Sequence, residues 1–198
     1  MTAPIAILLF AAGSSSRMGA RDKLTEDVDG EPLLRRSALR AIATGLPVHA
    51  LLPPDRPERW RAVEGLDLTL TAVPDARDGM SASIRAGLAS LPERTPGTIM
   101  LMADMPDLES ADLTALAKRF ADLGSQTVVR AATEDGRPGA PALIPRHLFP
   151  ALQALQGDTG GRDVLKSVPQ DLVPLPGRRA VTDLDTPDDW AEWRETRG

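Results

Sequence analysis

The chain of 198 residues lacks cysteine and tyrosine, and it contains only two histidines, His49 and His147. Without cysteine there is no disulfide framework, no cysteine-ligated zinc or iron–sulfur centre and no thiol nucleophile. Two histidines exclude a multi-histidine metal site, and they allow a Ser–His–Asp triad only if one of the two serves in it. Aromatic residues make up 3% of the chain, so the core must consist of Leu, Ile, Val and Ala.

Long apolar runs and an excess of positive charge are also missing. No segment reaches the roughly 18 to 20 apolar residues that span a bilayer, and no basic residue precedes the apolar run 5–12, as it would in a signal peptide. Acidic residues outnumber basic ones by 28 to 23, a net charge of −5, which disfavours non-specific binding to nucleic acid or to an anionic membrane. We therefore expect a cytoplasmic protein without a nucleic-acid or membrane partner.

Apolar strand patterns alternate with helical patterns along most of the chain. Strands are expected at residues 5–10, 48–52, 68–73, 98–103 and 127–132, and helices at 32–45, 57–65, 81–91, 110–123 (with Ser110 as the cap) and 186–196. Short connections between such elements predict an α/β fold with a mostly parallel central sheet. We expect one domain over residues 1–198.

A Pro/Gly-rich stretch, residues 137–180, interrupts this alternation. It is interpreted as an insertion over the one domain, with an edge strand near 142–144 and short helices near 146–155 and 161–167.

The loop directly after the first strand, residues 11–19, is rich in Gly and Ser. Ligands of open α/β sheets bind outside the carboxyl ends of the strands. Small residues there expose backbone N–H groups and hydroxyls to an anion, while Arg17 and Lys23 can neutralise its charge. This predicts a phosphate-binding loop but not a P-loop, because five residues separate Gly13 from Gly19 and Ala20 follows. The alternative is an ordinary Ser/Gly turn with a solvated arginine.

Three aspartates are candidate metal ligands. Asp104 follows the strand 98–103 at the same edge of the sheet, and Mg²⁺ is typically held by one or two carboxylates together with substrate phosphates. Asp183 and Asp185 flank Leu184, so in an extended segment they point the same way and repel unless a cation or water intervenes. The alternatives are a plain loop aspartate for Asp104 and a helix cap at Asp185 or Thr186.

Several short stretches, in this order along the chain, carry a family resemblance: 9–19, 23–24, 30–34, 79–88, 102–106, 157–162 and 183–189. The chain resembles the MobA-like nucleotidyltransferases, and most closely the molybdenum-cofactor cytidylyltransferase branch. The resemblance implies a three-layer α/β/α Rossmann-like fold. It also implies Mg²⁺-dependent transfer of CMP from CTP to the phosphate of molybdopterin cofactor, with release of pyrophosphate.

The resemblance also assigns roles to residues. Catalytic roles fall to Arg17, Lys23 and Asp104, magnesium binding to Asp104, Asp183 and Asp185, and the acceptor side to residues 137–180. The implied nucleotide-binding residues are Ala11, Ala12, Gly13, Ser14, Ser15, Ser16, Arg17, Met18, Gly19, Lys23, Gly79, Ser81 and Ser83.

The sequence leaves the substrates open. Residues 11–13 resemble the cytidylyl pattern, whereas the three residues between Gly19 and Lys23 resemble the guanylyl enzymes, so GTP and ATP stay alternatives to CTP. A sugar- or polyol-phosphate acceptor on the same fold is a second possibility. A third is a non-catalytic cofactor carrier or maturation partner, for which the protein partner is a molybdoenzyme or its chaperone.

Overall fold

The computed structural model describes residues 4–157 and 160–197. A central sheet has the strand order β5-β4-β1-β6-β8-β7-β9, and β2 and β3 form a small hairpin. The strands are β1 Ala6–Phe10, β2 Asp27–Val28, β3 Glu31–Pro32, β4 Val48–Leu52, β5 Thr69–Ala72, β6 Gly97–Met102, β7 Val128–Ala132, β8 Pro138–Pro145 and β9 Gln170–Pro174. All neighbouring pairs in the central sheet are parallel except those that include β8.

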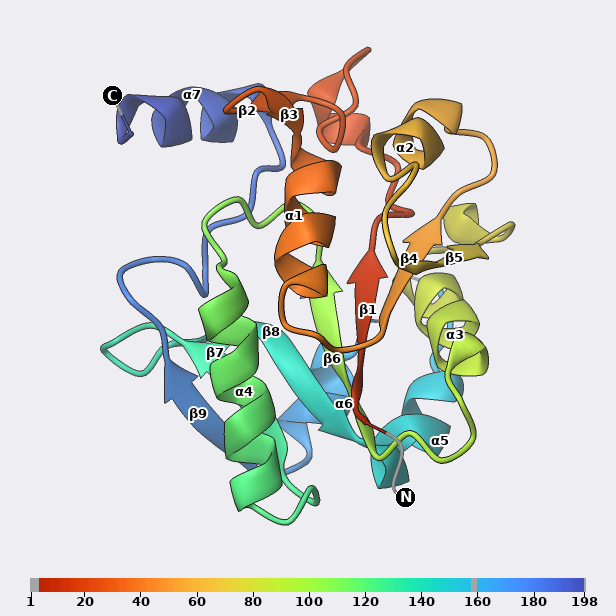
Figure 1. Cartoon of the computed structure of the whole chain (residues 1–198), viewed down its shortest axis with the longest axis vertical. Coiled ribbons are helices and arrows are strands. Elements are labelled where there is room, and N and C mark those ends of the chain that lie inside the picture. Colours follow the sequence, from red (N-terminus) through yellow and green to blue (C-terminus); the bar gives the residue numbers. More distant parts are fainter. Residues whose placement is uncertain (1–3, 158–159, 198) are drawn as a thin grey trace.

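Helices cover both faces of this sheet (Figure 1). The helices are α1 Leu33–Ile42, α2 Pro57–Ala62, α3 Met80–Ser90, α4 Ser110–Asp122, α5 Phe149–Gln153, α6 Arg162–Lys166 and α7 Pro187–Glu195, with short 3-10 turns at Ser16–Met18, Ala76–Asp78 and Arg146–Leu148. Helices α1 and α4 pack on one face, and α3, α5 and α6 on the other. The predicted three-layer α/β/α class with a mostly parallel sheet is confirmed.

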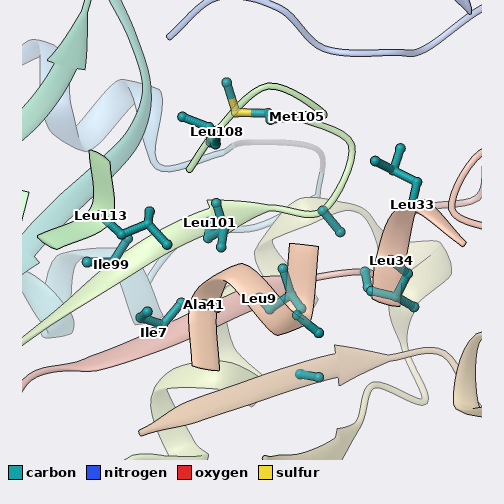
Figure 2. Packing of buried hydrophobic residues seen from close by; sticks show 14 of the residues in the cluster. Ile7, Leu9, Leu33, Leu34, Ala41, Ile99, Leu101, Met105, Leu108 and Leu113 are labelled. Carbon is teal, nitrogen blue, oxygen red and sulfur yellow. The ribbon is translucent and has the colours of Figure 1, made fainter. Parts of the chain in front are cut away.

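Strand β1 shows why a continuous apolar run suits the centre of such a sheet. Ile7 and Leu9 belong to the cluster under α1 and α4, whereas Leu8 and Phe10 belong to the cluster under α3 and α5. Successive side chains of a strand point to opposite faces, so both faces need apolar residues when both are covered. Figure 2 shows Leu9 beside Leu34 and Ala41 of α1 in the first cluster.

The sheet differs from expectation in its second half. The prediction of an edge strand near 142–144 is wrong in both place and length. The strand there, β8, spans Pro138–Pro145 and is an interior strand, antiparallel to both β6 and β7. Pro141 falls in the register shift between β7 and β8, where its missing N–H breaks no regular ladder. β9, which the sequence analysis missed, is one edge of the sheet. The stretch 137–180 thus contributes two strands to the central sheet.

Two helix starts differ in how well their caps were predicted. Thr186 caps α7, accepting a hydrogen bond from the amide of Asp189, as one of the two alternatives expected. Ser110 as the cap of α4 is wrong, because Glu109 occupies that position and forms a capping box with Asp112. Among the helices that the structure describes, none is both long and apolar enough to cross a bilayer.

Candidate functional site

A pocket of about 630 Å³ opens at the carboxyl edge of the parallel strands, where ligands of α/β sheets bind. Its wall comes from the loop after β1, the segment after β6, the start of β8 and the residues before α7. Its volume lies in the range of small-molecule sites, roughly 300–1,000 Å³. Its lining includes Ala12, Gly13, Ser14, Ser15, Ser16, Arg17, Lys23, Gly79, Ser83, Asp104, Arg130, Arg137, Gly139, Asp183 and Asp185.

Asp104 is held in place by three parts of the chain. The amide of Ala103 donates to the carbonyl of Phe10 (3.2 Å), which keeps this segment beside β1. The hydroxyl of Ser37 in α1 donates to the carbonyl of Ala103 (3.0 Å). The amide of Leu184 donates to the carbonyl of Asp104 itself (3.0 Å). This last bond brings the segment 183–185 against Asp104, although the two are far apart in sequence.

A network of opposite charges fills the mouth of the pocket. Nζ of Lys23 lies 2.5 Å from Oδ2 of Asp104 and 2.6 Å from Oδ1 of Asp185. Nη2 of Arg17 lies 2.7 Å from Oδ2 of Asp185, although the Arg17 side chain is 65% exposed. The structure therefore joins the three residues with predicted catalytic roles through Asp185.

The pKa values of this network move in directions set by burial and charge. Burial raises the pKa of Asp185, but Lys23 and then Arg17 outweigh it, so the pKa lies below its ordinary value. Burial lowers the pKa of Lys23, but the carboxylates of Asp104 and Asp185 outweigh this effect, so the pKa lies above its ordinary value. The pKa of Asp183 is raised, first by burial and then by the neighbouring carboxylates of Asp104 and Asp185. Asp183 is thus the carboxyl group that a further cation would most relieve.

The carboxylates fit a divalent cation in their chemistry, but they do not form a ready-made cage. Oδ1 of Asp104 is buried and has no hydrogen-bond partner within the described part of the chain, and oxygen ligands of this kind suit Mg²⁺. Across residues 4–157 and 160–197, however, no three His, Cys, Asp or Glu side chains are grouped as a metal site. The ammonium of Lys23 already bridges two of the three predicted ligands.

The inner side of the loop is held by Arg59 of α2, which the sequence analysis missed. Its guanidinium is fully buried. It forms a two-pronged ion pair with Asp22 and also donates to loop carbonyls. An arginine in a short, arginine-rich helix gives no signal of such a role, because the contact joins residues 37 positions apart in sequence.

Most of the predicted nucleotide-binding residues line the pocket, but four do not. Ala11 and Met18 are buried in the core on the α1 side of the sheet, and Gly19 provides the turn after residues 16–18, with a φ of +66°. Ser81 is fully buried, and its hydroxyl accepts a hydrogen bond from Arg85 (3.1 Å). Neither histidine belongs to the described lining. In the motif 157–162, residues 158 and 159 lie outside the described residues.

The far side of the pocket includes the start of the stretch that the resemblance assigns to the acceptor, together with Arg130, which the sequence analysis did not single out. Arg130 of β7 and Arg137 line it together with Gly139 at the start of β8. A Cβ atom on Gly139 would lie 1.9 Å from the carbonyl oxygen of Ala180, so only glycine permits this close approach. The Pro/Gly-rich composition of residues 137–180 does not indicate this packing of Gly139 against Ala180.

Comparison with known proteins agrees with this arrangement. The model of the MobA-like NTP transferase domain matches residues 7–172. A molybdenum cofactor guanylyltransferase of Pseudomonas aeruginosa is 30% identical, over 98% of this chain and 96% of its own. The crystal structure of Rv0371c from Mycobacterium tuberculosis superposes with a TM-score of 0.82 at 26% identity, covering 98% of this chain and 100% of that one.

A manganese complex of Rv0371c from the same organism superposes with a TM-score of 0.79 at 24% identity, covering 98% and 100% of the two chains. The family model covers most of the chain, and the Pseudomonas relative matches over nearly the whole of both chains. The family resemblance drawn from the sequence is confirmed: the chain belongs to the MobA-like NTP transferase family.

Proposed function

We propose that this nucleotidyltransferase transfers CMP from CTP to the phosphate of molybdopterin cofactor and releases pyrophosphate. One observation carries the proposal. A single pocket joins a Gly/Ser loop, the cations Arg17 and Lys23, and the carboxylate of Asp104 to a second cationic side at Arg130 and Arg137. Such a pocket suits two phosphorylated substrates that meet between its two sides.

The reaction needs little covalent chemistry from the protein. An oxygen of the acceptor phosphate attacks the α-phosphorus of the nucleotide, and the bond from that phosphorus to the bridging oxygen breaks as pyrophosphate leaves. The acceptor phosphate is ionised at neutral pH, so no general base is required. Arg17 and Lys23 stabilise the phosphate charge and hold the triphosphate in place, which provides most of the rate enhancement in transfers of this kind.

The proposal includes a divalent cation, Mg²⁺, that would neutralise charge on the triphosphate when bound. Asp104 would hold it through its unpartnered Oδ1, and Asp183 is the second candidate because Asp185 already pairs with Arg17 and Lys23. Burial and then the carboxylates of Asp104 and Asp185 raise the pKa of Asp183, and this crowding of carboxylates favours cation binding there. The manganese complex of Rv0371c supports a divalent ion in general.

The proposal also includes the base of the nucleotide, for which cytosine is the first candidate. Ala12 lines the pocket, and residues 11–13 resemble the cytidylyl pattern, which favours CTP. GTP is the second candidate, because the Pseudomonas relative is a guanylyltransferase and the spacing of Gly19 and Lys23 resembles that branch. Few aromatic side chains are present to stack on a base, so its selection depends on backbone and small side chains of the loop.

The order of strands favours a division of the pocket between the two substrates. The loop follows β1, Asp104 follows the neighbouring β6, and Arg137 and Gly139 lie at the start of the next strand, β8. We assign the β1 side to the nucleotide and the β8–β7 side to the acceptor. Arg179, which also lies in the stretch 137–180, pairs with Asp112 and is not among the pocket-lining residues.

Pyrophosphate release tests the proposal directly. Purified protein is assayed with Mg²⁺, molybdopterin cofactor and CTP, GTP, ATP or UTP in turn, with Asp104→Ala as the inactive control. We expect turnover with CTP above the other nucleotides. Faster turnover with GTP would replace the base, and no turnover above the control with any nucleotide would refute transfer to this acceptor.

Two further measurements address the remaining alternatives. An acceptor screen at fixed CTP includes sugar and polyol phosphates, and faster turnover with one of these would replace molybdopterin cofactor. Tight cofactor binding without pyrophosphate release would support the carrier function and a molybdoenzyme or chaperone as partner.

A further inference from the structure

The Arg59–Asp22 ion pair lies directly behind the loop that follows β1, on the side away from the pocket. We propose that this pair positions the loop for phosphate binding. By holding two carbonyl groups of the loop, it turns the amides of Ala12 and Ser14 toward the pocket. The inference rests on the proposed function in one respect, that the pocket receives the phosphates of a nucleotide.

The guanidinium of Arg59 has a partner for each of its five N–H donors. Nε and Nη2 donate to Oδ2 and Oδ1 of Asp22 (2.7 and 2.9 Å). Nη1 donates to the carbonyls of Ala11 and Gly13 (2.6 and 2.7 Å). Nη2 also donates to the hydroxyl of Ser15 (2.9 Å). A side chain with no free donor and no exposed surface cannot contact substrate, so its influence must pass through the loop.

The geometry of the peptide group sets the direction of that influence. In a planar trans peptide, the carbonyl of one residue and the N–H of the next point in opposite directions. The carbonyls of Ala11 and Gly13 point inward to Arg59, so the amides of Ala12 and Ser14 point outward, and both residues line the pocket. Within the described chain these two amides donate to no other group. Backbone amides that point to the same side of a loop can form an anion-binding concavity.

The same pair connects the loop to Lys23. Oδ1 of Asp22 accepts hydrogen bonds from the hydroxyl of Ser15 (3.1 Å) and from the amide of Leu24 (3.0 Å), so it holds the chain on both sides of Lys23. Ser15 has a φ of 54°, a left-handed conformation that a residue other than glycine adopts only when its surroundings enforce it. The pair thus fixes the shape of the loop and the place where the Lys23 side chain begins.

A purely structural ion pair would be expected to join α2 to the sheet. Instead, all the hydrogen-bond partners of the Arg59 side chain lie in residues 11–22. The pair therefore acts on the loop itself, and the loop's function is the quantity that should respond when the pair is altered.

Arg59→Lys tests the inference, because lysine keeps the charge but lacks the planar fork of donors. The probe is inorganic tripolyphosphate without metal, with affinity measured by titration calorimetry at a temperature well below the unfolding midpoint of each variant. The control is Arg119→Lys, which alters another two-pronged arginine–aspartate pair, with Asp171, outside the pocket. We expect at least a tenfold weaker Kd in Arg59→Lys and less than a twofold change in the control.

A measurement on the wild-type protein covers the case in which Arg59→Lys does not fold. In ¹⁵N-labelled protein, added tripolyphosphate should shift the amide resonances of Ala12 and Ser14 more than those of Ala11 and Gly13. A shift confined to other residues, or no binding of tripolyphosphate by the wild type, would overturn the inference. So would a folded Arg59→Lys variant that binds tripolyphosphate as the wild type does.

Failure of this inference can be told from failure of the proposed function. Tripolyphosphate carries no base and undergoes no transfer, so its binding is independent of turnover. Wild-type protein that binds tripolyphosphate through Ala12 and Ser14 but never releases pyrophosphate would refute the proposed function alone. Normal transfer by an Arg59→Lys variant with unchanged affinity would refute this inference alone.

Discussion

Arg59 and Lys23 flank the same loop, one on its inner side and one at the mouth of the pocket, and their surroundings differ. The guanidinium of Arg59 is buried with every donor satisfied. Lys23 bridges Asp104 and Asp185, yet Oδ1 of Asp104 stays without a partner in the described residues. The inner network, which is Arg59 with Asp22 and the loop groups that it binds, has all its donors satisfied before any ligand arrives. The outer network, which is Lys23 and Arg17 with Asp104 and Asp185, gains from an added cation. We infer that the inner network is a rigid support for the loop, whereas the charged groups of the outer network can exchange partners when a ligand binds.

The largest expected effect concerns the inner network. Arg59→Leu removes the buried cation from the buried carboxylate of Asp22 and leaves only the partly exposed Arg56, 3.7 Å away. Breaking a buried pair in this way costs about 3–5 kcal/mol of unfolding free energy. Arg17→Leu, which removes an exposed arginine from the outer network, should cost less than about 1 kcal/mol. Urea denaturation of both variants checks the contrast.

The double variant Arg59→Leu/Asp22→Leu is the control for this explanation. It removes the unpaired charge and should recover part of the loss in Arg59→Leu. No recovery would mean that the loss comes from packing of α2 and not from the buried charge.

The second effect concerns activity in the outer network. Asp104→Asn removes charge next to the reacting phosphates and should lower kcat/KM about 100-fold, the scale of a lost electrostatic group in an active site. Because Lys23 keeps Asp185 as a partner in this variant, the free energy of unfolding should change little. Asp107→Asn is the matched control, since Asp107 lies in the same segment but accepts a hydrogen bond from Trp193 outside the pocket. Similar losses of activity in both variants would contradict the role of Asp104.

The difference between the two networks also explains what the sequence could predict. The alternation of apolar runs and helices predicts an α/β fold with a mostly parallel sheet, because burial on both faces leaves a local signature in each parallel strand. Asp104 was found because it follows a strand end, where α/β sheets bind ligands, and Lys23 because it is a cation close to the Gly/Ser loop that follows β1.

Arg59 and the interior, antiparallel place of β8 were missed for the opposite reason. Arg59 acts through contacts with residues distant in sequence, and nothing around it differs from a solvated helical arginine. β8 is antiparallel within a mostly parallel sheet, and its prolines resemble loop composition. Long-range pairing, not local pattern, determines both.

The third prediction concerns Lys23, whose ammonium group lies between two carboxylates of the outer network. Lys23→Met removes the ammonium from between Asp104 and Asp185, and two unit charges 4 Å apart interact by about 4 kcal/mol at an effective dielectric constant of 20. Binding of Mn²⁺ without nucleotide should therefore tighten at least about tenfold, even allowing for solvent screening. Titration followed by electron paramagnetic resonance measures the free Mn²⁺. Lys118→Met, which removes an exposed helix-surface lysine, should leave the affinity unchanged, and an equal gain there would show a general charge effect.

The smallest expected effect separates the networks by the pH dependence of stability. Burial raises the pKa of Asp22, but Arg59 outweighs it, so its pKa lies below the ordinary 3.8. The unfolded chain then binds this proton more tightly, so the stabilisation by Asp22 is present above pH 3.8 and is lost as the pH falls through the lowered folded pKa. The pKa of Asp183 is raised, first by burial and then by Asp104 and Asp185, so its ionised form opposes folding as the pH rises above 3.8.

The two aspartates should therefore give variants of opposite sign. At pH 7, Asp22→Asn should be less stable than the wild type, and Asp183→Asn should be slightly more stable, with an advantage that shrinks as the pH approaches 4. Chemical denaturation at several pH values between 4 and 7 measures both, with the exposed Asp188→Asn as the control for simple loss of charge. The effect at Asp183 is small because its side chain remains exposed to solvent. A destabilised Asp183→Asn at pH 7 would mean that this carboxylate is already satisfied, and the contrast between the two networks would not extend to it.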